Sequence, residues 1–458
     1  MNQATISAVT ARQRRFFDTG VTMDIRYRRA ALMRLQKVVN EHESELAAAL
    51  RQDLGKSGTE SYMCEIGMVH SELRWLLKNL KRLTRDQRAS TPLHQFLARS
   101  FRRPSPYGVT LIMSPWNYPV LLTLAPLADA LAAGNTAVVK PSADAPATSK
   151  LLARLLGSIF PAAYVEVIEG GREQNGWLLE EKFDYIFFTG SKKVGRLVLE
   201  QAAKHLTPVT LELGGKSPCI VHSSADLAAA ARKIVFGKFL NCGQACIAPD
   251  YVLCEESVRE EFLRLLRLEI QRQYGKDYKF NLSYGRIVSK KHFDRLLGLL
   301  EPEKVFLGGA SDKEALRIEP TLMTDVTWDD AVMQEEIFGP ILPVLTFTDV
   351  EEVIDTVRDH EKPLALYLFA KDKAVIDRIT KRCQFGGGCI NDVTIHLATT
   401  EMPFGGVGES GMGSYHGQAG FNTFTHYKSM VKAGPLDLPV RYQPYTKKSE
   451  KLIRFFLK

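Results

Sequence analysis

Short apolar runs alternate with amphipathic stretches between residues 107 and 213. The runs have the length and β-branched content of buried strands, and the stretches between them repeat apolar residues at helical spacing. The expected strands are residues 108–114, 136–140, 164–170, 185–190 and 208–215, and the expected helices are residues 118–134, 145–160, 174–179 and 191–206. This alternation predicts a parallel, doubly wound sheet that is covered by helices on both faces.

Ligands of such a sheet bind beyond the carboxyl ends of its strands. Three of the expected strands end in polar sequences, SPWN at 114–117, KPS at 140–142 and FTGS at 188–191. The sequence therefore predicts a ligand site at this edge.

The flanking segments have different patterns. Residues 24–54 are predicted to form one long amphipathic helix that ends at Gly55, and a second helix is expected over residues 61–83. The polar, proline-containing segment 85–106 predicts an excursion away from the main body. Residues 214–397 look like a second α/β region, and the glycine-rich segment 401–428 is expected to be mostly loop.

Length and composition limit the protein class. A chain of 458 residues is too long for one ordinary core, which predicts two large domains, or two large domains and a small third one. The formal charge of +8 is mild, and no nucleic-acid-binding motif is present, so a nucleic-acid partner is not expected. The N-terminal residues lack the apolar core of a signal peptide. Seven cysteines without a framework spacing suit a reducing compartment, which predicts a cytoplasmic protein.

Two cysteines four residues apart, Cys242 and Cys246, stand in the segment FLNCGQACIAP. A zinc site is not expected, because no histidine lies within residues 239–254 and the next cysteine is Cys254. Most intracellular cysteines are small buried residues. The neighbouring small residues instead favour a backbone turn, where a thiolate can have a lowered pKa and access to solvent.

Four other side chains are candidate functional residues. Glu212, at the end of an apolar strand, is either an ion-paired residue or a general base whose pKa is raised by apolar neighbours. Asn117 is either a helix cap or an amide donor to an oxyanion. Ser191 starts a helix that could meet a phosphate, although the glycine fingerprint of dinucleotide sites is missing. Glu336, in EEIFGP, could belong to an ordinary acidic loop.

The order of these motifs is more specific than any one of them. PWNYP, KPS, FTGS, LELGGKSP, GQAC, EEIFGP and PFGGVGESGMGSYHG follow one another as they do in the aldehyde dehydrogenase superfamily, over about residues 107–428. The chain resembles its class 3 branch, which acts on fatty and aromatic aldehydes. The resemblance implies a Rossmann-like parallel-sheet cofactor domain, an α/β catalytic domain and a small bridging arm. We expect residues 1–86 and 107–213 in the NAD(P)-binding domain, residues 214–397 in the catalytic domain, and residues 87–106 and 398–458 in the arm and tail.

The resemblance also implies roles for individual residues. Cys246 matches the nucleophile, Asn117 the oxyanion donor and Glu212 the general base. The residues that match cofactor contacts for NAD or NADP are Trp116, Lys140, Ser142, Thr189, Gly190, Ser191, Gly214, Glu336 and Phe338. No metal is implied. The product would be a carboxylic acid, released from a thioester by hydrolysis.

One position departs from the branch. The residue after KPS is usually glutamate, which favours a free adenosine 2′-hydroxyl, and here it is Ala143. The loss of this carboxylate removes a repulsion against a 2′-phosphate, which predicts that NADP is tolerated.

Three rival functions are set against this interpretation. An acylating dehydrogenase would transfer the thioester to coenzyme A, but such enzymes generally lack the glutamate of LELGG. A Cys-His hydrolase could use His396 or His416 as its base, and a third possibility is a non-catalytic dehydrogenase fold.

The arm and the tail carry the expectations about partners. The resemblance implies a homodimer that is bridged by the arm. The basic tail at 447–458 has apolar residues on one helical face. We expect it to dock on the partner subunit or over the substrate funnel, with contact to an anionic membrane surface as the less favoured alternative.

Overall fold

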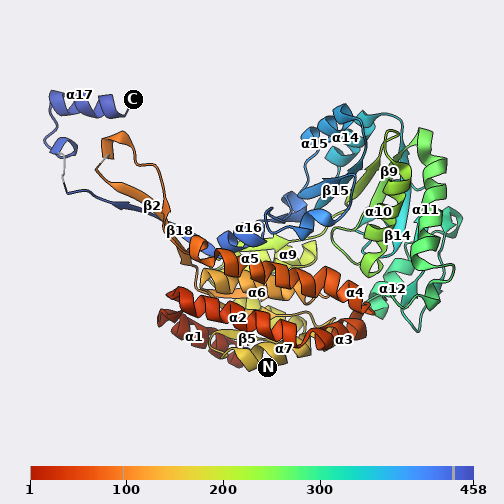
Figure 1. Cartoon of the computed structure of the whole chain (residues 1–458), viewed down its shortest axis with the longest axis horizontal. Helices are drawn as coiled ribbons and strands as arrows, with labels where there is room; N and C mark the ends of the chain where they lie inside the picture. The colour runs from red at the N-terminus through yellow and green to blue at the C-terminus, as the bar shows by residue number, and fades with distance from the viewer. Residues whose placement is uncertain (1, 96, 436–438, 458) are drawn as a thin grey trace.

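The computed structural model describes residues 2–95, 97–435 and 439–457, which form two α/β regions and a projecting arm (Figure 1). We call the region around the six-stranded sheet the first layer and the region around the seven-stranded sheet the second layer. The first sheet has six strands in the order β17-β7-β6-β3-β4-β5. Its strands are β3 (Val109–Met113), β4 (Thr136–Lys140), β5 (Val165–Val167), β6 (Tyr185–Thr189), β7 (Val209–Glu212) and β17 (Gly411–Met412). All pairs are parallel except that of β17 with β7. The five strands predicted between residues 107 and 213 are therefore confirmed.

Alternate residues of these strands enter different cores. Leu111 and Val138 join a cluster with α1, α8 and α9, whereas Ile112 and Val139 join a cluster with α2, α5, α6 and α7. Side chains on a strand alternate between its faces, so the sheet is covered by helices on both sides. The covering helices are α1 (Gln3–Asp18), α2 (Ile25–Glu41), α5 (Gly67–Leu83), α6 (Leu121–Ala133), α7 (Pro146–Ile159), α8 (Arg172–Glu180) and α9 (Lys192–Ala203).

The prediction of one helix over residues 24–54 is wrong. The chain forms α2 and then α3 (Glu43–Leu54), with a break at His42. The His42 ring lies 3.0 Å from the Val38 carbonyl oxygen, which also accepts from the His42 backbone N–H. Glu43 and Glu45 stand in the first turn of α3, where acidic residues favour a new helix start. The second predicted helix is interrupted as well, because α4 (Gly58–Ser61) leads through a π-helical turn at Tyr62–Ile66 into α5.

The second sheet has seven strands in the order β10-β13-β14-β9-β8-β15-β16. They are β8 (Pro218–Val221), β9 (Tyr251–Glu255), β10 (Val305–Leu307), β13 (Thr321–Met323), β14 (Ile341–Phe347), β15 (Ala365–Phe369) and β16 (Gly387–Ile390). Only β10 is antiparallel to its neighbour. The helices of this region are α10 (Leu227–Phe239), α11 (Arg259–Tyr274), α12 (Lys290–Leu297), α13 (Ala331–Gln334), α14 (Val350–Asp359) and α15 (Lys373–Arg382), and a hairpin joins β11 (Ser311–Asp312) to β12 (Arg317–Ile318). A second α/β region is thus present, as expected.

The arm is a three-stranded antiparallel sheet that projects from the body (Figure 1). It consists of β1 (Gln87–Arg88), β2 (Arg99–Pro106) and β18 (Thr425–Lys432), and β2 lies in the middle. The tail helix α17 (Lys447–Phe456) lies beyond the end of this sheet. The polar segment 85–106 is therefore an excursion from the body, as its sequence predicts.

The glycine-rich segment 401–428 holds more structure than the expected loop. It contains β17, α16 (Gly417–Thr423) and the start of β18. Residues 411–423, which were expected in the arm, belong to the first layer instead, because β17 pairs with β7 and α16 packs on α5 and α6. Within the described part of the chain, no helix is long and apolar enough to cross a membrane.

Candidate active site

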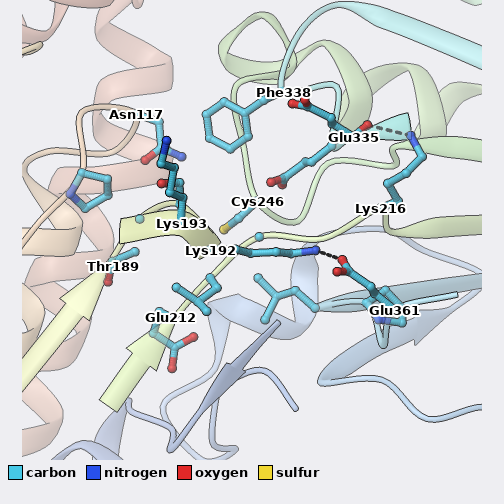
Figure 2. A pocket seen from close by; sticks show the side chains of 18 of the residues that line it. Asn117, Thr189, Lys192, Lys193, Glu212, Lys216, Cys246, Glu335, Phe338 and Glu361 are labelled. Carbon is cyan, nitrogen blue, oxygen red and sulfur yellow. Dashed lines mark hydrogen bonds and ion pairs between the residues drawn. The ribbon is translucent and has the colours of Figure 1, made fainter. Parts of the chain in front are cut away.

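A cavity of about 620 Å³ opens between the two layers, at the carboxyl ends of the first sheet's strands (Figure 2). Ten of the twelve predicted site residues line it: Trp116, Asn117, Thr189, Gly190, Ser191, Glu212, Gly214, Cys246, Glu336 and Phe338. They come from segments up to 222 positions apart in the chain, and the fold brings them to one place. Lys140 and Ser142 are outside the lining that the described residues form.

Cys246 stands on a tight loop between α10 and β9. Three consecutive residues, Asn241, Cys242 and Gly243, have positive φ angles of 49°, 53° and 73°. Such angles strain residues other than glycine, and that strain is frequently found at functional sites. A Cβ at position 243 would lie 2.2 Å from the Gly339 carbonyl oxygen, so glycine allows this turn to meet the EEIFGP loop.

The buried amide of Gln244 holds this loop in place. Its Nε2 donates to the carbonyl oxygens of Asn241 and Arg286, at 3.0 Å each, and its Oε1 accepts from the Val288 N–H at 2.9 Å. These bonds fix the backbone two residues before Cys246. The role of Gln244 was not predicted, because two of its three partners, Arg286 and Val288, lie more than 40 positions away along the chain.

The Cys246 sulfur points into the cavity, with Asn117 and Glu212 on different sides of it (Figure 2). Burial raises the pKa of the Cys246 thiol well above its usual value, and the nearby carboxylates of Glu336 and Glu212 raise this pKa further. The backbone N–H groups of Cys246 and Ile247 act in the opposite direction. The expected lowering of the thiol pKa at this turn is therefore wrong for this arrangement, because desolvation disfavours the charged form more than two N–H groups favour it.

This raised pKa predicts the pH dependence of alkylation in the cofactor-free protein. Below its pKa, the thiolate fraction of a cysteine rises about tenfold per pH unit, so iodoacetamide should label Cys246 ever faster from pH 7 to pH 9, without a plateau. Glu336→Gln should speed labelling, because it removes a carboxylate that raises the pKa, whereas Glu409→Gln, at an exposed position, should not. The measurement is the labelling rate of the Cys246 peptide. A plateau below pH 8.5 would contradict the raised pKa.

Asn117 lies in the loop between β3 and α6 and is almost fully buried. Its Nδ2 donates to the Gln244 carbonyl oxygen at 3.1 Å. An amide nitrogen carries two hydrogens, so the second one is left for a group in the cavity. The Asn117 side chain does not cap α6, whose first N–H groups are bonded by Glu65 instead.

Glu212 ends β7 with its carboxyl group buried beside the cavity. Among the described residues neither of its carboxyl oxygens has a hydrogen-bond partner. Burial raises the pKa of Glu212 well above its usual value, which is the environment predicted for a general base. Glu212 forms no ion pair with any described residue, so the alternative of an ion-paired strand end is not supported.

Glu336 and Phe338 enter the cavity from the EEIFGP loop. A Cβ at Gly214 would lie 1.9 Å from the Glu336 Oε2, so glycine is needed for this carboxylate to approach the strand end. Burial and the neighbouring Asp250 raise the pKa of Glu336 to about 8. Phe338 meets the Trp116 ring edge-on, with ring centroids 5.3 Å apart.

The EEIFGP loop is held to the main body by Lys216. Its Nζ lies 2.5 Å from Asp250 Oδ2 and donates to the carbonyl oxygens of Val332 and Glu335, at 3.1 and 3.0 Å. Asp250 in turn accepts from the Ile337 N–H at 2.9 Å. These contacts fix the backbone on both sides of Glu336 and do not involve the Glu336 carboxylate.

The start of α9 also lines the cavity. Ser191 is its N-cap residue, and its side chain makes no capping bond within the described structure. The first N–H groups of a helix have no partner inside the helix, so they are available to an anion. Lys192 forms an ion pair with Glu361 across the cavity, which links the two layers (Figure 2). This pair was not predicted, since 169 positions separate its members.

Comparison with known proteins identifies the family of this chain. The model of the aldehyde dehydrogenase family matches residues 1–430. A 4,4'-diaponeurosporen-aldehyde dehydrogenase of Staphylococcus aureus is 45% identical over 96% of this chain and 97% of its own length. The chain belongs to the aldehyde dehydrogenase family. Aldehyde dehydrogenase family 3 member A2 of Rattus norvegicus is 42% identical over 97% of this chain and 93% of its own, which confirms the resemblance to class 3.

Solved structures agree with this family. A substrate-bound Staphylococcus aureus AldH matches with a TM-score of 0.97 and 44% identity, over 99% of both chains. An indole-3-acetaldehyde dehydrogenase complexed with NAD⁺ matches with a TM-score of 0.87 and 27% identity, over 94% of this chain and 89% of its own. The protein is thus an NAD(P)-dependent aldehyde dehydrogenase with the fold of that family.

The residues around this aldehyde dehydrogenase's cavity fit a nicotinamide dinucleotide. Thr189 Oγ1 is buried and without a partner in the described ranges, next to the uncapped start of α9. The Glu336 carboxylate lies against Gly214, where a side chain would fill the space. A hydroxyl, free N–H groups and a carboxylate are the groups that phosphates and ribose hydroxyls bind.

Lys140 and Ser142 lie at the end of β4, beside this region. Lys140 is almost fully buried and its Nζ donates to the Pro141 carbonyl oxygen at 2.7 Å. Burial lowers the pKa of Lys140 to about 8. Ser142 Oγ accepts from the Asp144 N–H at 3.2 Å, and Ala143 is exposed between them.

The cysteine and histidines of the rival interpretations lie elsewhere. Cys242 is buried in the core of the second layer and is hydrogen-bonded to the Tyr284 side chain. A Cβ at Gly285 would lie 3.5 Å from the Cys242 Sγ. His416 lies 3.1 Å from Glu72 Oε2 and His396 3.5 Å from Cys389 Sγ, and neither histidine lines the cavity that the described residues enclose. Neither of the two histidines considered as the base of a Cys-His hydrolase therefore lies in the cavity with Cys246.

Proposed function

We propose that this aldehyde dehydrogenase oxidises medium- and long-chain aliphatic or aromatic aldehydes to carboxylic acids. The observation that carries the proposal is the meeting of Cys246, Asn117 and Glu212 in one cavity. The wall of this cavity includes the apolar side chains Leu122, Phe404 and Tyr415, which suit an apolar substrate chain.

The first step is addition of the Cys246 sulfur to the aldehyde carbon. The C–S bond forms while the carbonyl π bond breaks, and the electron pair moves to oxygen. Asn117 Nδ2 and the Cys246 backbone N–H donate to this oxyanion. Loss of one such donor typically costs about 10²–10³ in rate. A carbon held covalently in one orientation also reacts faster than a free aldehyde.

A nicotinamide dinucleotide in this cavity would supply the hydride acceptor for that carbon. Glu336 would hold its nicotinamide ribose, while Thr189, Ser191 and the start of α9 would hold its phosphates. Trp116 and Phe338 exclude water from the nicotinamide end, since their rings close one side of the cavity.

The remaining thioester on Cys246 is opened by water. Glu212 takes the water proton, the new oxygen bonds to the acyl carbon, and the C–S bond breaks to return the thiolate. A base with a raised pKa binds that proton more strongly than an exposed glutamate does, provided that it is ionised first. Turnover should therefore rise with pH as Glu212 loses its proton.

A substrate panel tests the proposed function. The reaction is followed by the near-ultraviolet absorbance of reduced nicotinamide, with short aliphatic, long-chain and aromatic aldehydes. We expect kcat/KM to rise with chain length from the short aldehydes and to be high for aromatic ones. A preference for short, polar aldehydes would contradict the proposed substrate class, and no reduced cofactor with any aldehyde would contradict the oxidation itself.

The exposed Ala143 predicts that the enzyme uses NADP as well as NAD. Ala143→Glu should raise the KM for NADP about tenfold and leave that for NAD within about twofold, because a carboxylate near a phosphate costs about 1 kcal/mol or more. Ala147→Glu, four positions further along the chain and in the first turn of α7, serves as the control. The measurement is kcat/KM for both cofactors. A large NAD preference in the wild-type enzyme would contradict the prediction.

We also propose a homodimer that forms through the arm. The outer edge of β18 has no paired strand within the described residues, and an exposed edge of eight residues is a site for pairing with another chain. The helix α17 has no buried residue, and its Leu452 and Phe455 and the following Leu457 are exposed. The helix lies beyond the arm, away from the two sheets of its own chain (Figure 1). We place this helix on the partner subunit. A cytoplasmic location is supported by seven free cysteines.

Removal of the tail distinguishes the partner subunit from a membrane. Residues 447–457 carry Lys447, Lys448, Lys451 and Arg454 against Glu450, and Lys458 lies outside the described residues. Full-length and 1–446 proteins should both pellet only slightly with anionic liposomes. In light scattering, the truncated dimer should dissociate at protein concentrations at which the full-length dimer is still intact. Pelleting of the full-length protein alone would instead support binding to the membrane.

A further inference from the structure

Two fully buried charged side chains, Lys56 and Glu65, lie beneath the loop that carries Asn117. Lys56 Nζ donates to Glu65 Oε1 at 2.6 Å and to the Asn117 carbonyl oxygen at 2.7 Å. It also lies 4.0 Å from the centre of the Tyr118 ring. Both charged side chains are 0% exposed, so each has lost its hydration. Apolar residues of similar size often stabilise a core as well as a buried ion pair does, so this pair needs another explanation.

Glu65 holds the far end of the same loop. Its second oxygen accepts from the N–H groups of Val120 and Leu121, at 2.8 and 3.1 Å, where α6 begins without a side-chain cap of its own. Glu65 reaches this position from the π-helical turn Tyr62–Ile66. A Cβ at Gly67 would lie 2.8 Å from the Tyr62 carbonyl oxygen, so the irregular turn is built into the sequence. Such turns are frequent at functional sites.

A second set of bonds joins the Asn117 loop to the Cys246 loop. Asn241 Nδ2 donates to the carbonyl oxygens of Asn117 and Gln244, at 2.9 and 3.1 Å. The Asn241 N–H in turn donates to Glu60 at 2.8 Å. The Asn117 carbonyl oxygen therefore accepts from both Lys56 and Asn241, and it joins the two loops together with the bond from Asn117 Nδ2 to the Gln244 carbonyl oxygen.

We infer that Lys56 and Glu65 are positioning residues that fix the Asn117 amide relative to Cys246. The inference rests on the proposed function, in which Asn117 stabilises the oxyanion. An oxyanion donor must lie about 2.7–3.1 Å from the developing charge, and a misplacement of about 1 Å can cost about 10² in rate. Lys56 and Glu65 act through Asn117, because neither side chain lines the cavity formed by the described residues.

A double-mutant cycle with Asn117→Ala separates positioning from general stabilisation. Lys56→Met should lower kcat/KM for an aldehyde about 10–100-fold in the wild-type background and less than about twofold in the Asn117→Ala background. The dissociation constant of NAD(P) should stay within twofold of wild type. Lys37→Met, which removes an exposed lysine of similar length, should change neither quantity.

A second variant keeps the test decisive if Lys56→Met does not fold. Lys56→Met with Glu65→Gln removes both charges, so it leaves no unpaired buried ion, and it should show the same dependence on Asn117. Equal losses in the two backgrounds, or full activity of the folded variants, would overturn the inference. If Asn117→Ala itself keeps full activity, the proposed oxyanion role fails instead, so the two failures are distinguishable.

Discussion

Replacement of Cys246 by alanine should lower kcat/KM at least about 10⁴-fold, because Cys246 is the one cysteine among the described residues that line the cavity. The variant should fold normally. The Cys246 sulfur points into the cavity, so its removal costs little packing. The dissociation constant of NAD(P) should stay within about threefold of wild type.

Cys242→Ala is the matched control for this variant. It removes a sulfur four positions earlier, from the core of the second layer and not from the cavity. Its kcat/KM should fall less than about threefold, although its melting temperature should fall because the substitution leaves a small void. If both variants lose activity equally, the loss reflects the loop fold and not the Cys246 sulfur.

Replacement of Glu212 by glutamine should separate oxidation from hydrolysis. Neither oxygen of Glu212 has a partner in the described structure, so an amide of the same size breaks no hydrogen bond. Reduced nicotinamide should appear in a burst of about one equivalent per active site, and the steady rate that follows should be about 10²–10⁴-fold below wild type. Stopped-flow absorbance measures both phases.

Two outcomes would contradict the role of Glu212. An unchanged steady rate means that another group activates water, and the absence of a burst means that Glu212 acts before the thioester forms. Glu409→Gln, on the exposed turn before β17, is the control and should behave as wild type. Coenzyme A should not restore the steady rate of Glu212→Gln. If it does, the enzyme is an acylating dehydrogenase.

The sequence predicts the parts of the fold that depend on local periodicity. Four of the five strands between residues 109 and 212 are short apolar runs that are buried on both faces, so their pattern is unambiguous. The fifth, β5, is shorter and partly buried. The break at His42 is missed because apolar spacing continues through it, and the helix start at Glu43 depends on charge. The strands of the arm are missed because their residues are half-exposed and polar.

The site is predictable where motif order identifies a residue, and not where long-range contacts decide its environment. Cys246, Asn117 and Glu212 meet in one cavity as predicted. The direction of the Cys246 pKa shift depends on burial, which no local pattern reveals, and then on Glu336, 90 positions away. The positioning pair Lys56 and Glu65 acts on Asn117 across more than 50 positions, so its role is visible only in three dimensions.

Peptide mass spectrometry of Glu212→Gln tests the central claim most directly. The variant is mixed with a long-chain aldehyde and NAD(P), quenched in acid during the slow phase, and digested. We predict one acyl group per chain, with the mass of the corresponding carboxylic acid minus water, on the peptide that contains Cys246. Acylation of any other residue, or a chain that carries no acyl group while reduced cofactor accumulates, would contradict the covalent mechanism.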